Sequence, residues 1–62
     1  MAEFTIGEKT VKLTAQEGGY LVAKSTARNS WVFKSYGMKV EDYHQALEYF
    51  KGIVREWLSE YD

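Results

Sequence analysis

The spacing of the apolar residues changes once along this chain of 62 residues, and that change limits the folds open to it. Up to residue 36, apolar and polar residues tend to alternate, which is the period of a half-buried β-strand. From about residue 40 to residue 61, apolar residues recur every three or four positions, as in an amphipathic helix. The helical stripe consists of Val40, Tyr43, Leu47, Phe50, Val54, Trp57 and Tyr61. The pattern predicts a sheet followed by one helix.

Turn-forming residues divide the first part of the chain into four predicted strands. The strands are expected at 4–6, 9–15, 20–26 and 30–36, and the breaks between them at Gly7-Glu8, Glu17-Gly18-Gly19 and Ala27-Arg28-Asn29. Connections this short favour neighbouring antiparallel strands. The predicted fold class is α+β, with the order β-β-β-β-α. It is a four-stranded antiparallel β-meander with one C-terminal amphipathic α-helix packed on one face, and residues 1–62 form a single domain.

The small size of the chain predicts self-association. A domain of this length buries only about 60% of the surface that its unfolded chain exposes. The sequence has no cysteine for a disulfide and only one histidine, which makes a structural zinc site implausible. The apolar arc of the helix is broad, and Gly52 lies in the middle of the helix on its far side. Both features fit a second helix packed closely, although a wide core stripe and a tolerated glycine explain them equally well. A homodimer is therefore expected, with an interface made by Phe50, Ile53, Val54, Trp57 and Tyr61.

Alternation along the strands predicts which side chains share each face of the sheet. The helix side is expected to hold Phe4, Ile6, Val11, Leu13, Ala15, Leu21, Ala23 and Phe33, with Trp31 in the same set. The free side is expected to hold Lys12, Lys24 and Lys34 together with Tyr20, Val22, Val32 and Tyr36. A slip of one residue in any strand would exchange its two faces.

Lysine and tyrosine on one uncovered face are typical of a surface for single-stranded nucleic acid. Ammonium groups can follow a phosphate backbone, and aromatic rings accept stacked bases. A solvated sheet face also needs polar residues, so three lysines alone decide little. The predicted contacts are Lys12, Tyr20, Lys24, Arg28, Trp31, Lys34 and Tyr36. Trp31 is ambiguous, because its parity favours the core, and Arg28 is equally well explained as a solvated turn residue.

The distribution of charge supports a basic sheet and an acidic helix. Residues 1–40 hold six basic and three acidic side chains, and residues 41–62 hold two basic and six acidic ones, which gives +3, −4 and a total of −1.

The sequence contains no recognisable catalytic constellation. His44 has no second ligand-type neighbour, the serines have no base in a known motif, and the glycines form no phosphate loop. The acidic pairs lie where helix ends and solvated faces place them, whereas acid–base catalysis needs carboxylates in a cleft. We therefore expect a binding protein and not an enzyme, with no cofactor, metal or small-molecule substrate. The absence of a membrane span and of a leader favours a cytoplasmic protein.

Three segments resemble the positive-cofactor-four family of transcriptional coactivators and their bacterial and phage relatives. They are Phe4-Thr5-Ile6-Gly7, Gly18-Gly19-Tyr20-Leu21-Val22 and Gly37-Met38-Lys39-Val40-Glu41-Asp42-Tyr43. The resemblance spans nearly the whole chain. It implies a homodimer whose helices meet and whose curved sheets bind single-stranded DNA, with Lys12, Lys24 and Lys34 on phosphates and an aromatic residue stacked on a base. The acidic Glu8, the short loop between the last two strands and the lower positive charge depart from the family pattern.

Two segments also resemble HicB-type antitoxins. They are Glu17-Gly18-Gly19-Tyr20-Leu21-Val22-Ala23 and Glu41-Asp42-Tyr43-His44-Gln45-Ala46-Leu47. This resemblance implies a protein partner and no catalysis, although the chain has an extra hairpin at its start and lacks the later strand. The leading hypothesis is a dimeric binder of single-stranded DNA or RNA. The alternative is a protein–protein interaction module, such as an antitoxin-like protein or a phage-encoded inhibitor of a host protein.

Overall fold

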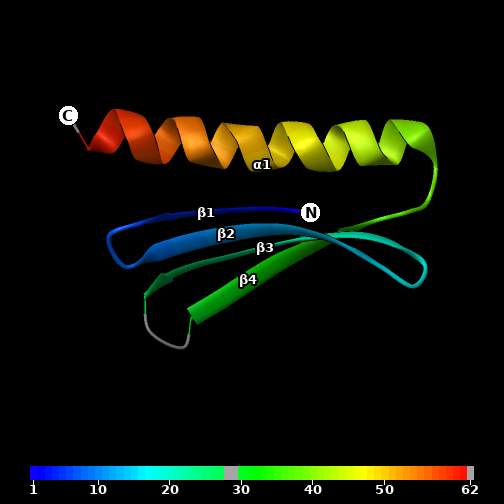
Figure 1. Cartoon of the computed structure of the whole chain (residues 1–62), viewed down its shortest axis with the longest axis horizontal. Coiled ribbons are helices and arrows are strands. Elements are labelled where there is room, and N and C mark those ends of the chain that lie inside the picture. The colour runs from blue at the N-terminus through cyan, green and yellow to red at the C-terminus, as the bar shows by residue number, and fades with distance from the viewer. Residues whose placement is uncertain (28–29, 62) are drawn as a thin grey trace.

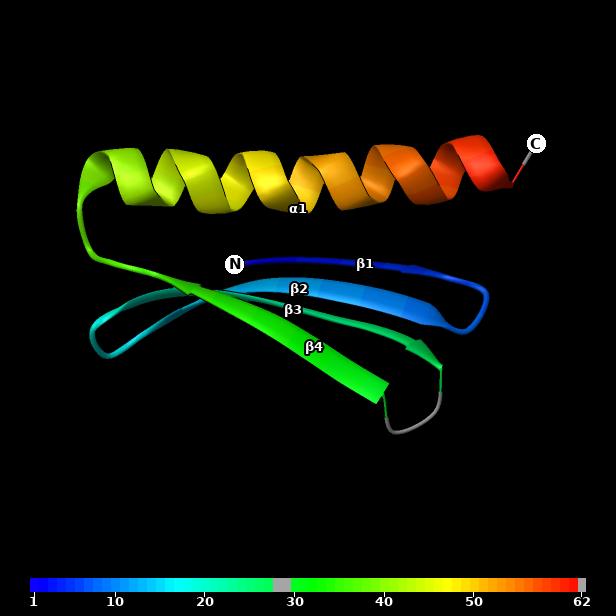
Figure 2. The same cartoon turned by 180° about the vertical axis from the view of Figure 1, so that it is seen from behind.

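A computed structural model describes residues 1–27 and 30–61, which form one antiparallel sheet and one helix. The strands follow one another in the sheet in the order β1-β2-β3-β4, and α1 lies across one face (Figures 1 and 2). The elements are β1 (Ala2–Ile6), β2 (Lys9–Gln16), β3 (Gly19–Ala27), β4 (Ser30–Tyr36) and α1 (Val40–Glu60). The predicted α+β class and the β-β-β-β-α order are confirmed, and the predicted bounds differ by at most two residues.

The turn between β2 and β3 consists of Glu17 and Gly18, so Gly19 is already the first residue of β3. Gly19 is buried and has a φ of 151°. A Cβ atom at this position would lie 1.9 Å from the carbonyl oxygen of Tyr36 at the end of β4. Only glycine allows β3 to begin so close to the backbone of its neighbour.

The helix begins without a side-chain cap hydrogen bond. Lys39 occupies the N-cap position in an extended conformation, and only its carbonyl oxygen is used, accepting hydrogen bonds from the backbone N–H groups of Asp42 and Tyr43 at 3.0 and 3.1 Å. Glu41 and Asp42 place negative charge in the first turn, where it interacts favourably with the helix dipole. Packing on the sheet must therefore supply most of the stability of this helix.

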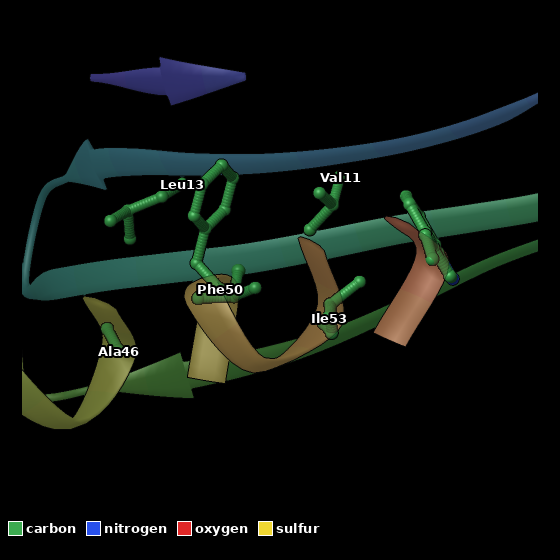
Figure 3. Close-up of a cluster of buried hydrophobic side chains, with 7 residues drawn as sticks. Val11, Leu13, Ala46, Phe50 and Ile53 are labelled. Atoms are coloured by element: carbon green, nitrogen blue, oxygen red, sulfur yellow. The ribbon is translucent and has the colours of Figure 1, made fainter. Parts of the chain in front are cut away.

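The hydrophobic core lies between α1 and the middle of the sheet (Figure 3). Its buried members are Val11, Leu13, Val22, Ala46, Phe50, Ile53 and Trp57. The helix residues recur at spacings of three and four and so point from one face of α1 toward β2 and β3.

The predicted faces of β3 and β4 are wrong by one residue. Because the turn at Glu17-Gly18 has only two residues, Leu13 pairs with Val22 and not with Leu21 or Ala23. Directly paired residues point to the same face of a sheet, so Val22 joins Leu13 in the core. The residues of β3 and β4 that were predicted to share a face do share one. The two faces of both strands are therefore exchanged together. The residues that move to the uncovered face are Leu21, Ala23, Trp31 and Phe33, and those that move to the helix side are Tyr20, Val22, Lys24, Val32, Lys34 and Tyr36.

The sheet twists away from α1 along β4. Figures 1 and 2 show that β4 lies far below the helix at its beginning and rises toward it at its end. Val32 is consequently 56% exposed although it lies on the helix side, whereas Tyr36 at the end of the strand packs against the core.

Candidate nucleic-acid interface

The face of the sheet opposite α1 is not covered by any other element of residues 1–27 and 30–61. We call it the open face. The strand pairing places on it Glu3 and Thr5 from β1, Thr10, Lys12 and Thr14 from β2, Leu21, Ala23 and Ser25 from β3, and Trp31, Phe33 and Ser35 from β4. The 3.2 Å hydrogen bond between the hydroxyl groups of Thr5 and Thr10 agrees with this assignment.

Two aromatic side chains dominate the open face at its β4 edge. Trp31 is 49% exposed and Phe33 is 67% exposed. They are two residues apart on one strand, so their Cα atoms lie about 7 Å apart and their side chains point the same way. Leu21 and Ala23, both half-buried, lie beside them on β3. The result is an apolar strip that presents ring surface to solvent.

Lys12 adds a positive charge next to this strip. Its ammonium group lies 5.7 Å from the centre of the Trp31 ring, reaching over β3 from β2. A carboxylate oxygen of Glu3 lies 4.0 Å from the same ammonium group and offsets part of its charge. The side chains of Lys12 and Glu3 are 44% and 60% exposed, so this ion pair contributes little to stability and can open at low cost.

Ser25 fixes the backbone beneath Trp31. Its hydroxyl group donates a 2.8 Å hydrogen bond to the carbonyl oxygen of Ala27, at the point where the pairing of β3 with β4 shifts by one residue. Ser25 is 7% exposed and lies directly opposite Trp31. This irregularity sets the position of Trp31 at the start of β4, since such shifts redirect the side chains around them.

Four of the predicted contact residues lie on the helix side of the sheet. The ring of Tyr20 packs 5.1 Å, centre to centre, from that of Tyr43 in α1. The ammonium group of Lys34 lies 5.3 Å from the Tyr49 ring and 5.5 Å from the Tyr36 ring. Lys24 pairs with Val11 and Val32 in the ladder and shares their face. The prediction that these residues share the free face with Lys12 is wrong.

Trp31 is the reverse case. The sequence favoured the core for this residue, and the structure contradicts that placement, because the ring lies on the open face. Phe33 and Leu21 accompany it there, so the predicted placement of both residues on the helix side is wrong. The two-residue turn before Gly19 was the signal that could have identified them. The predicted contact at Arg28, and most of the predicted turn at 27–29, lie outside the described residues.

The helix residues expected at a dimer interface are mostly occupied within the chain. Phe50, Ile53 and Trp57 are 9%, 5% and 5% exposed because they pack against the sheet. Val54 is half-buried and Tyr61 is 73% exposed. Leu58 and Val40 are also exposed, and the helical period places them on one flank at opposite ends of α1. A dimer through the helix would have to use this flank.

The described residues include no group of three His, Cys, Asp or Glu side chains placed to hold a metal ion. Within the same residues, no helix combines the length and the apolar composition needed to cross a membrane. A shallow cavity of about 290 Å³ opens between the β1–β2 turn and the end of α1, next to Trp57 and Tyr61. At this end of the molecule, the ammonium group of Lys9 donates a 2.7 Å hydrogen bond to Glu60.

Comparison of the chain with models of protein families, with curated proteins and with solved structures finds no match. The resemblances to the positive-cofactor-four family and to HicB-type antitoxins therefore stay predictions. A function for the open face has to be inferred from the chemistry of its own residues.

Proposed function

We propose that this chain is a non-enzymatic binder of single-stranded nucleic acid that acts as a homodimer, in transcription or DNA metabolism. The observation that carries the proposal is the pair Trp31 and Phe33, exposed side by side on the open face with Lys12 beside them. Each base stacked on an aromatic side chain contributes about 1–3 kcal/mol. Two rings on one strand offer stacking surface to two successive bases.

Stacking has the larger share in this proposal, and phosphate contacts have the smaller one. Among residues 1–27 and 30–61, Lys12 is the one lysine that the strand pairing places on the open face. Each phosphate contact to a single strand adds about 0.7 to the slope of log affinity against log salt concentration. We therefore expect binding that weakens with salt, with a shallow slope.

The test is a fluorescence anisotropy titration with a labelled 20-mer of mixed sequence, as DNA and as RNA, at several salt concentrations. Trp31→Ala and Phe33→Ala should each lower the affinity by roughly 5- to 150-fold, which corresponds to about 1–3 kcal/mol. Val32→Ala is the matched control, because Val32 lies between them, is 56% exposed and points to the helix side. Absence of binding at low salt, or equal losses in all three variants, would contradict the proposal.

The second candidate is a protein–protein interaction module, and one observation favours it. The outer edge of β4 meets no other strand of the described chain, and Trp31, Val32 and Phe33 are exposed along it. Edges of this kind accept an added strand from a partner. A pull-down that retains one stoichiometric protein and no nucleic acid would favour this candidate.

A further inference from the structure

β4 is a long, unprotected edge strand. It has seven residues and forms one end of the sheet, so half of its backbone N–H and C=O groups point away from β3 with no strand opposite them in residues 1–27 and 30–61. The other edge, β1, has five residues, and every second one is half-buried. The two edges therefore differ in how readily they accept another strand.

The usual features that prevent edge pairing are sparse on β4. Natural edges carry proline, charges or bulges. The chain has no proline, and the one charged residue of β4 is Lys34. Three consecutive residues, Trp31, Val32 and Phe33, are 49%, 56% and 67% exposed. An edge of this composition is expected to pair.

We infer that two copies of this chain join their β4 strands antiparallel, so that Phe33 lies opposite the partner's Phe33. A two-fold axis perpendicular to the sheet relates such strands and keeps each face of one copy continuous with the same face of the other. Directly paired residues must point to the same face of the sheet. Under this symmetry that condition is met only if the axis passes beside a residue that pairs with its own copy, and not beside a peptide bond. Centring the axis on Phe33, the midpoint of Ser30–Tyr36, allows all seven residues to pair.

The resulting pairs are chemically compatible. Phe33 lies opposite the partner's Phe33 on the open face. Aromatic cross-strand pairs stabilise sheets. Trp31 lies opposite the partner's Ser35 on the same face, and Val32 lies opposite the partner's Lys34 on the helix side. No like charges lie directly opposite one another. The second copy is therefore favoured over an unrelated peptide, which would have to supply this complementarity independently.

This pairing, which takes its ligand from the proposed function, would double the binding surface. The rings of Trp31 and Phe33 would continue into those of the partner's Phe33 and the partner's Trp31. The two tryptophans would then be offset by four residues, or about 14 Å along the strands. A single oligonucleotide could stack on both copies, and the site of one copy is half of the complete site. The flank of α1 stays free in this arrangement.

Cysteine crosslinking tests the register. Residues directly opposite in an antiparallel pair have Cα atoms about 4.5–5.5 Å apart, within the range of a disulfide. Phe33→Cys should therefore form a disulfide-linked dimer under mild oxidation at a few hundred micromolar protein. Val32→Cys is the matched control. The two Val32 positions would be offset by two residues and lie about 8 Å apart, which is too far to bridge.

A mixture of Val32→Cys and Lys34→Cys chains supplies a second test that leaves Trp31 and Phe33 intact. These positions lie opposite each other in the proposed register, so the mixture should give a heterodimer while neither variant alone gives a homodimer. We expect at least about tenfold faster crosslinking for the matched positions, because pairing raises their effective concentration. Circular dichroism of the reduced variants checks that they fold.

The inference would be overturned if Phe33→Cys crosslinked no faster than Val32→Cys, or if the mixture of Val32→Cys and Lys34→Cys chains gave no heterodimer. The same result with a wild-type dimer in sedimentation would show that the two copies associate through another surface. Wild-type affinity for the 20-mer is measured separately and distinguishes the two proposals. Binding without the crosslinking pattern removes only the β4 pairing, and the pattern without binding removes only the nucleic-acid function.

Discussion

On the side of the sheet that α1 covers, Val11, Leu13 and Val22 are each at most 1% exposed. On the open side, Trp31 and Phe33 leave half or more of their surface in solvent. Both faces therefore carry large hydrophobic side chains, but only those on the covered face are buried in the core. A domain of this size has little apolar surface to spare, so large rings left exposed on one face indicate a use other than folding.

Adjacent residues of one strand point to opposite faces of the sheet, so their substitution should have very different effects on the free energy of unfolding. Leu13→Ala should lower the free energy of unfolding by about 2–5 kcal/mol, because it leaves a cavity beneath α1. Thr14→Ala, one residue further on the open face, should change it by less than about 0.5 kcal/mol. Urea denaturation followed by circular dichroism measures both. Equal losses would mean that the open face is packed as tightly as the core.

The register that separates the two faces depends on Gly19. Gly19→Ala should destabilise the fold by about 1–3 kcal/mol or shift the pairing of β3, because its Cβ would meet the Tyr36 carbonyl oxygen at 1.9 Å. Gly52→Ala is the control, since a Cβ there meets nothing within 4 Å. It should stabilise the helix by about 0.5–1 kcal/mol. A melting temperature that rises in both variants would contradict the two-residue turn at Glu17-Gly18.

The lysines of the two faces should differ in their contribution to binding. Lys12→Ala should weaken oligonucleotide binding and reduce its salt slope by about 0.7, because Lys12 lies on the open face. Lys34→Ala should leave the slope nearly unchanged, because the ammonium group of Lys34 lies between Tyr36 and Tyr49 on the helix side. Anisotropy titrations at several salt concentrations give both slopes. A larger change for Lys34→Ala would move the binding surface to the helix side.

The smallest expected effect concerns the ion pair that joins β2 to the end of α1. Glu60→Gln removes the charge that Lys9 meets at 2.7 Å. Both side chains are at least one-third exposed, so the loss in stability should be about 0.2–1 kcal/mol and should shrink at high salt. Thermal unfolding at low and high salt measures it, and oligonucleotide affinity should not change. A fall in affinity would connect this end of the molecule to binding.

The sequence alone was enough to predict the elements of this fold and their order. The spacing of Val11 and Leu13, and of the stripe from Val40 to Tyr61, reports directly which residues one face of an element can bury. These are local properties, and the bounds of every element were predicted to within two residues.

The faces of β3 and β4 could not be predicted with the same success, because they depend on one residue in a turn. Counting Gly19 as part of the loop places Leu21 and Phe33 in the core, and counting it in β3 places Val22 there. Both alternatives bury hydrophobic residues, so composition does not discriminate between them. Gly19 also lies against the backbone of Tyr36 at the end of β4, a residue far from it in the sequence, and the local pattern does not reveal this approach.

The most direct test of the open face as the binding surface is an NMR titration of the ¹⁵N-labelled protein with a single-stranded 20-mer. We expect the largest shift changes at the residues of the open face, including the indole N–H of Trp31: Lys12, Leu21, Ala23, Trp31 and Phe33. Changes at Trp57 and at the residues of α1 that face the core should be small. Shift changes confined to α1, or none at a tenfold excess of nucleic acid at low salt, would contradict this placement of the binding surface.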